Sequence, residues 1–263
     1  MSAAATLSEA DLCSAFIKAV TEPRRVIGAK WVAYPETAGF DILLVRADGF
    51  QIGVEAKLVL NARVVAQVLP YREGWCSGSK AGPDCRAVLV PFGKCNDDLV
   101  RICAALGVTV IRLHVEAPKG GGTWGHPFNP YLPDEQTKLA ADDWHPWAPP
   151  ERCPVPEYVP DVQAGASAPV KLSEWKVKAI RLSVMLEERP VTRADFKALQ
   201  LSPTNWLCPH GWLARGEGGG WVRCDRTPDF ERQHPTNYAQ IRADRARWMP
   251  AASAPRQVQV AML

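Results

Sequence analysis

The sequence predicts an α/β protein in which a mixed sheet is flanked by helices, followed by a smaller unit of helices and a β-hairpin. Residues 7–114 alternate in the order helix, three strands, helix, strand, helix, strand. Residues 115–170 are rich in proline, and residues 171–250 return to patterns typical of folded structure. The chain of 263 residues is long enough for two modest domains.

Residues 7–21 predict the first helix. Ser8 is the expected N-cap, and Asp11 stands three residues later at the capping-box position. Glu9, in the first turn, is a candidate for an acid that reaches a metal site. An ordinary first-turn acid, favoured by the helix dipole, is the preferred interpretation of Glu9.

Three strand-like runs follow, and a turn joins the last two. The runs cover residues 31–34, 40–46 and 51–58. Residues 47–49 read Ala-Asp-Gly, a turn typical of a hairpin. Glu36, just after the first run, is a second candidate for an additional acid.

Charged residues lie at the open end of this hairpin, where the first strand begins and the second strand ends. If the strands pair, Asp41 lies near Glu55 and Lys57, and the last two point to one face because they are two residues apart. Two converging carboxylates suit Mg²⁺, or Mn²⁺ in its place, which prefers oxygen ligands. A lysine beside such a cation can orient water or stabilise charge on a phosphate.

The rest of this part alternates between helices and strands. Its predicted elements are a helix at 62–69, a strand at 85–92, a helix at 96–106 and a strand at 108–114. Asn61 and Asn96 are the expected N-caps of the two helices. Arg63 and Gln67 share one helix face, which either faces a phosphate or is a solvated polar face.

The hairpin resembles the PD-(D/E)XK phosphodiesterase superfamily of restriction-type nucleases and junction resolvases. Asp41 and Glu55-Ala56-Lys57 match its motif, although Phe40 stands where a proline is often found. The resemblance covers roughly residues 8–114. It implies that residues 1–114 form a domain with a restriction-endonuclease-like fold. It also implies that Asp41 and Glu55 bind the metal and that Lys57 serves the nucleophilic water.

A second match follows downstream. Gln67 and Tyr71 fit the QxxxY element of exonuclease-like branches, with Pro70 falling inside the element. The resemblance implies that Gln67 supports the catalytic site and that Tyr71 contacts nucleic acid.

Residues 171–250 predict helices at 172–189 and 192–200, a third helix starting at Ser202-Pro203, and a hairpin near 212–223. Three helices and a hairpin resemble a winged helix, which places its third helix in the DNA major groove. The candidate contacts are Arg193, Lys197, Thr204, Asn205, Arg215 and Arg223. Such domains also bind proteins, and the third helix offers no Arg or Lys.

The remaining segments are predicted to be a linker and a tail. Residues 115–170 hold eleven of the 23 prolines and are expected to form a connector. Residues 251–263 are expected to be a loose tail.

Composition indicates a reduced, cytoplasmic protein without a membrane span. The net charge of +3 is too small to indicate nucleic acid by itself, and the eight cysteines lack a disulfide spacing. Four further residues leave a structural zinc site open, with core cysteines and surface histidines preferred: Cys208, His210, Cys224 and His234.

Together these features predict a Mg²⁺-dependent nuclease that hydrolyses phosphodiester bonds in DNA, with a C-terminal domain that binds DNA or a protein partner. The alternative is a non-catalytic DNA- or protein-binding module on the same scaffold. A homodimer is also open, because many such nucleases dimerise to cut both strands.

Overall fold

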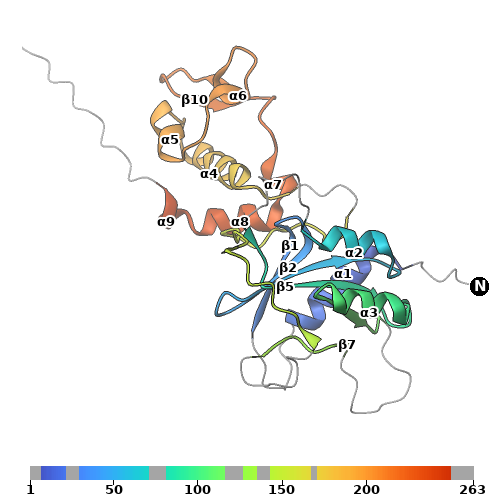
Figure 1. The fold of residues 1–263 in the computed structure, drawn as a ribbon. Coiled ribbons are helices and arrows are strands. Elements are labelled where there is room, and N and C mark those ends of the chain that lie inside the picture. The colour runs from blue at the N-terminus through green and yellow to red at the C-terminus, as the bar shows by residue number, and fades with distance from the viewer. Residues whose placement is uncertain are drawn as a thin grey trace, which may run out of the picture. The chain divides into compact units, whose positions relative to one another are not determined.

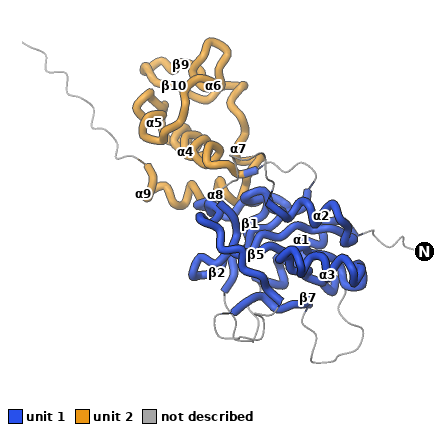
Figure 2. The backbone as a smooth tube through the Cα atoms, in the orientation of Figure 1, with its two compact units in different colours: residues 1–171 blue, residues 172–263 orange. Residues whose placement is uncertain are grey.

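The computed structural model describes residues 7–21, 30–70, 81–115, 127–134, 143–166 and 171–249. The chain divides into two compact units, residues 1–171 and 172–263, which Figure 2 draws in blue and orange. Within the described ranges no helix is long and apolar enough to cross a membrane. The predicted α/β class, a mixed sheet flanked by helices, is confirmed.

The first unit is built on a six-stranded mixed sheet (Figure 1). Its elements are α1 (Glu9–Thr21), β1 (Trp31–Thr37), β2 (Phe40–Arg46), β3 (Gln51–Ala56), α2 (Ala62–Val68), β4 (Ala81–Gly82), β5 (Cys85–Pro91), α3 (Asp97–Ala105), β6 (Val108–Leu113), β7 (Phe128–Asn129) and β8 (Glu151–Arg152). The sheet order is β1-β2-β3-β5-β6-β7, in which β3, β5 and β6 run parallel and the other pairs are antiparallel.

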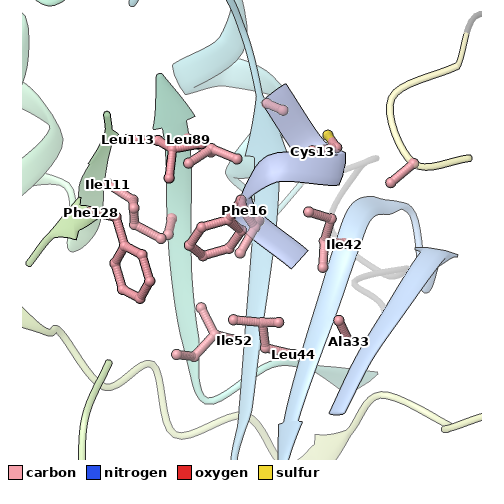
Figure 3. Close-up of a cluster of buried hydrophobic side chains, with 14 of the residues drawn as sticks. Cys13, Phe16, Ala33, Ile42, Leu44, Ile52, Leu89, Ile111, Leu113 and Phe128 are labelled. Carbon is pink, nitrogen blue, oxygen red and sulfur yellow. The ribbon is translucent and has the colours of Figure 1, made fainter. Parts of the chain in front are cut away.

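Helices cover both faces of this sheet. Phe16 of α1 packs among apolar side chains that include Ile52 and Leu89, as Figure 3 shows. The opposite face carries a second cluster, in which α2 and α3 contribute Val64 and Cys103. Every residue of β3 is buried, as expected for a central strand that is covered on both sides.

The predicted helix caps of the first unit are confirmed. The hydroxyl oxygen of Ser8 accepts a hydrogen bond from the backbone N–H of Asp11, whose carboxylate accepts from the backbone N–H of Ser8. The side-chain oxygen of Asn61 accepts from the first turn of α2, and that of Asn96 accepts from the first turn of α3. Each bond satisfies a backbone donor that has no partner within the helix.

A close approach inside the sheet fixes the residue that precedes Asp41. A Cβ atom at Gly53 of β3 would lie 2.6 Å from the ring of Phe40, so that only glycine leaves room for this ring. The guanidinium of Arg86 lies 5.4 Å from the centroid of the same ring. Phe40 is therefore anchored in the core, and it holds the start of β2 in place.

The predicted connector at residues 115–170 is wrong for the part that the structure describes, because this part belongs to the first unit. Strand β7 extends the main sheet, and Trp144 and Ala164 are buried in its core. The side chain of Gln51 exchanges two hydrogen bonds of 2.9 Å with the backbone of Cys153. Apolar residues among the prolines dock this segment, while the prolines keep its backbone extended.

The second unit contains the predicted hairpin and more helices than predicted. Its elements are α4 (Glu174–Glu188), α5 (Arg193–Ala198), α6 (Thr204–Leu207), β9 (Leu213–Arg215), β10 (Trp221–Arg223), α7 (Phe230–Gln233), α8 (Pro235–Ala243) and α9 (Arg245–Trp248). Strands β9 and β10 pair antiparallel, and Val191 forms an isolated bridge with Trp221. Pro203 precedes α6 as its N-cap, and this helix is only four residues long.

Aromatic rings form the core of the second unit. The Trp206 side chain is fully buried, with its ring centroid 5.1 Å from that of Trp212 and 6.1 Å from those of Phe196 and Phe230. A helix of four residues is too short to be stable by itself. Burial of the Trp206 indole among these rings therefore stabilises α6.

Candidate active site

Acidic residues gather where the strands of the first unit's sheet end, on the side on which β2 begins and β3 ends. Asp41 begins β2 and Glu55 lies near the end of β3, and these two strands are antiparallel neighbours. Glu36 lies near the end of β1, and Lys57 directly follows β3. Glu9 of α1 completes a set of four carboxyl groups and one ammonium group that influence one another electrostatically.

Asp41 is fixed by a backbone hydrogen bond. Its Oδ2 accepts a hydrogen bond of 2.8 Å from the backbone N–H of Ala56. Ala56 is the residue between Glu55 and Lys57. The register that pairs Ile42 with Val54 would, one step further, place Asp41 opposite Glu55. The Asp41 carboxylate also raises the pKa of Glu55, which supports the predicted proximity of the two carboxyl groups.

Lys57 is held by an acid from a different element. Its Nζ donates to Oε2 of Glu9 at 2.7 Å, and both side chains are about one-third exposed. The sequence favoured an ordinary first-turn role for Glu9. The structure instead places this carboxylate against the lysine, because α1 crosses the sheet with its N-terminal turn at the edge where β3 ends.

Glu55 is the most perturbed acid of the site. Only 9 % of the residue is exposed, and within the described residues its carboxyl group makes no hydrogen bond or ion pair. Burial raises its pKa from 4.5 to about 7, and the Asp41 carboxylate adds to the rise while Lys57 opposes it. Burial also raises the pKa of Asp41, although the Ala56 N–H and Lys57 act against this.

Glu36 sits at a strained point of the backbone beside these groups. Its φ of 48° lies in the left-handed region, which is uncommon for a residue with a side chain. Its Oε1 accepts from the backbone N–H of Gly165 at 2.9 Å, and Oε2 lies 3.9 Å from Nζ of Lys171. Burial raises the pKa of Glu36, and the Asp41 carboxylate adds to the rise.

Sequence reasoning missed the part that Gly165 plays. A Cβ atom there would lie 3.0 Å from Sγ of Cys13 and 3.2 Å from the backbone of Glu9, so this glycine fits tightly against α1. No local pattern around residue 165 indicates this contact. Its proximity to Glu36 depends on the docking of a segment 129 residues further along the chain.

The carboxyl groups of this cluster could hold a cation that needs only one or two protein ligands. In the described ranges no three or more His, Cys, Asp or Glu side chains are arranged to hold a metal ion. Mg²⁺ usually takes only one or two carboxylates and fills its other positions with water and substrate phosphate oxygens. The neighbouring Asp41 and Glu55 could meet that smaller requirement, and the Glu55 carboxyl makes no hydrogen bond or ion pair with another described residue.

The predicted helix-borne groups of α2 make no hydrogen bond or ion pair with the described residues of this cluster. Gln67 and Arg63 lie exposed on α2, and their side chains make no hydrogen bond or ion pair with any described residue. Tyr71 lies outside the described residues. Of the two residues of the QxxxY element, the structure therefore describes only Gln67, which is exposed on α2.

Predicted nucleic-acid contacts of the second unit fall into two groups. Arg193, Lys197 and Asn205 are exposed, the first two on α5 and the third on α6. Arg215 stacks on the Trp221 ring at 4.5 Å and donates to the Gly219 carbonyl.

The Arg223 side chain forms hydrogen bonds within the second unit. Its guanidinium donates to the backbone oxygen of Ser183 at 2.7 Å and to the hydroxyl of Tyr238 at 3.0 Å. This side chain therefore joins β10 to α4 and α8 while the residue stays exposed, and its contact with DNA remains a prediction.

The four residues considered for zinc have other neighbours. His234 is buried with Nε2 3.3 Å from Nζ of Lys176, and Sγ of Cys224 donates to the carbonyl of Trp212 at 3.3 Å. Cys208 is exposed, and each of the seven cysteines that the structure describes is free. The preferred interpretation of core cysteines and surface histidines is therefore wrong for His234, which is buried, and for Cys208, which is exposed, whereas His210 does lie at the surface.

Comparisons with known proteins returned no match: no family model, curated protein or solved structure is significantly similar to this chain. A functional proposal must therefore depend on the side chains at the edge of the sheet.

Proposed function

We propose that the first unit is a divalent-cation-dependent phosphodiesterase of the PD-(D/E)XK kind that hydrolyses DNA. The observation that carries this proposal is the hydrogen bond from the backbone N–H of Ala56 to the Asp41 carboxylate. Because Ala56 lies between Glu55 and Lys57, this bond ties Asp41 to the strand that carries both of these residues. The helix–three strands–helix–strand order of the unit supports the same class.

Asp41 and Glu55 are the residues that hold the cation, Mg²⁺ or Mn²⁺. When bound, the cation polarises the phosphate and makes water a better nucleophile near neutral pH. The buried carboxyl of Glu55, which has no hydrogen bond or ion pair among the described residues, supports this assignment, because a buried acid with a raised pKa and acidic neighbours is an unfavourable place for negative charge without a bound cation.

The chain's own groups then position the reactants. Lys57 orients the attacking water or stabilises the charge that develops on the phosphate. Glu9 fixes the lysine ammonium through the contact of 2.7 Å. Phe40, anchored over Gly53, keeps the start of β2 and therefore the Asp41 carboxylate in place.

The second unit is proposed to bind DNA or a protein partner. Its order of helix, single bridge, two helices and hairpin supports a winged-helix arrangement. The four-residue α6 is too short to read a major groove by itself, whereas Arg193 and Lys197 are exposed cations on α5. Contacts to phosphates, which carry no sequence information, suit this surface better than base reading.

The alternative is a non-catalytic binding module on the same scaffold. The ion pair between Lys57 and Glu9 favours it, because an ammonium group that already has a carboxylate partner is less available to a phosphate. Isothermal titration with Mn²⁺ separates the two functions. The phosphodiesterase requires a heat of binding that the Asp41→Ala variant loses, whereas equal heats in both proteins favour the binding module.

A cleavage assay tests the proposed function. Linear, nicked and single-stranded DNA are incubated with the protein in the presence of Mg²⁺ or Mn²⁺. Glu55→Ala and Lys57→Ala are expected to lower the rate by about 100-fold or more, since each removes a group that acts on the transition state. The exposed residues Glu151 and Lys30 supply the matched controls Glu151→Ala and Lys30→Ala, which are expected to keep the wild-type rate.

Equal cleavage by the wild type and both site variants would reject the assignment. Retention of the fold is checked by circular dichroism, so that loss of activity is not mistaken for unfolding.

A further inference from the structure

Two stacked aromatic rings, of which Phe92 is exposed and His114 is half-buried, lie at the ends of parallel strands on the side of the sheet where β3 ends at Lys57. Phe92 directly follows β5 and His114 directly follows β6, and these parallel strands end side by side. Their ring centroids are 4.1 Å apart with the planes 24° from parallel, so the rings are stacked. Phe92 is nevertheless 57 % exposed, the largest exposure among the large hydrophobic residues that the structure describes.

The backbone holds this pair in a defined position. The N–H of Phe92 donates to the carbonyl of Leu113 at 2.8 Å, which ties the two strand ends together. Lys94, two residues on, is fixed by two backbone bonds, since its N–H donates to Pro91 and its carbonyl accepts from Leu60. The Phe92 ring is thus held by backbone bonds on both sides of it while most of its surface stays open to solvent.

The same backbone connects the ring pair to the acidic cluster. The N–H of Lys57 donates to the carbonyl of Leu89 at 2.9 Å, and Phe92 lies three residues beyond Leu89. At about 3.3 Å per residue, the platform is roughly 10 Å from that point, a distance that a few nucleotides of one strand can span.

We propose that Phe92 and His114 form a stacking platform for an unpaired base of a single-stranded nucleic acid. Every base presents a flat π-face to such a ring, whereas bases inside a duplex are already stacked on their neighbours. The ammonium of Lys94 is exposed and makes no ion pair with any described residue, so it supplies the positive charge that a backbone phosphate needs.

The inference rests on the proposed function for its substrate class, since it specifies single-stranded DNA or an unpaired end. Its test measures binding without cleavage, so that the two can fail separately. A protein that binds single strands through Phe92 but never cleaves them would overturn only the phosphodiesterase proposal.

Fluorescence anisotropy with a labelled oligothymidylate of about 15 nucleotides, in EDTA, provides the assay. Phe92→Ala is expected to weaken binding by about 5- to 100-fold, the range found for loss of one base–aromatic stack. Phe92→Trp is expected to restore binding, because it supplies a larger π-face. The matched control is Ile102→Ala on α3, another exposed apolar residue, which is expected to bind like the wild type.

An abasic oligonucleotide of the same length distinguishes stacking from attraction to the backbone. The wild type is expected to bind it more weakly than oligothymidylate, and Phe92→Ala is expected to cause no further loss. The proposal is overturned if Phe92→Ala binds oligothymidylate like the wild type, or if it loses affinity equally for the abasic strand. It is also overturned if the wild type binds neither strand, or if Phe92→Ala changes only self-association in sedimentation.

Discussion

Replacing Glu55 with glutamine is expected to stabilise the first unit at pH 8 and to leave its stability almost unchanged at pH 4. Burial raises the pKa of this carboxyl from 4.5 to about 7. The favourable contribution of the protonated group is therefore fully present below pH 4.5 and is lost as the pH rises through about 7. Glutamine has nearly the same shape and stays neutral throughout this range.

The size of the effect follows from the difference between the two pKa values. At roughly 1.4 kcal/mol for each pH unit, it corresponds to about 3 kcal/mol by pH 8. Since urea unfolding has slopes of about 1–3 kcal/mol per molar, the midpoint of the variant should rise by about 1 M or more. This gain would accompany loss of the proposed activity, as expected where a site is built at the cost of stability.

Urea unfolding at pH 4, 6 and 8 in EDTA measures this change, and hydrogen exchange in β3 assigns it to the first unit. The exposed Glu151 provides the control variant Glu151→Gln, for which no pH-dependent gain is expected. Mg²⁺ added at pH 8 should stabilise the wild type more than Glu55→Gln, because the ion binds the carboxylate in the native state.

Two outcomes would refute this reasoning. Glu55→Gln could be less stable than the wild type at pH 8, which would mean that Lys57 and its surroundings stabilise the charged carboxylate. The gain could also be the same at pH 4 and pH 8, which would assign it to a cause other than ionisation.

Two further predictions concern packing in each unit. Gly53→Ala is expected to lower the free energy of unfolding by about 1–3 kcal/mol, because the new Cβ would lie 2.6 Å from the Phe40 ring. Thermal unfolding measures the loss against the control Gly218→Ala, whose Cβ would meet no atom within 4 Å, and an unchanged midpoint would show that the ring moves aside freely. Trp206→Ala is expected to destabilise the second unit by about 3–5 kcal/mol, since the indole is fully buried. Hydrogen exchange in α4 would report this loss while exchange in β3 stays unchanged, and the half-exposed Trp175 supplies the milder control Trp175→Ala.

The proximity of Asp41 to Glu55 could be predicted because it follows from local geometry. A short turn fixes which residues of a hairpin face each other, and alternation along the strand fixes the rest. The caps at Asn61 and Asn96 were predictable for the same reason, since each involves only the first turn of its own helix.

The docked segment after β6 could not be predicted from composition. Its prolines and glycines resemble those of a linker, and only the surface of the folded sheet shows where Trp144 and Ala164 fit. The hydrogen bonds of Arg223 could not be predicted for a similar reason, because its partners Ser183 and Tyr238 come from other parts of the chain.

The sequence by itself determined the order of helices and strands and the pairing that places two carboxyl groups and a lysine at one edge. Only the tertiary structure decided the chemical state of that edge. The partner of Lys57 is Glu9, 48 residues away, and the carboxyl of Glu36 is held by Gly165. The pKa of Glu55 depends on how much water its neighbours exclude, which is a property of packing between distant elements and is not encoded in the strand that carries it.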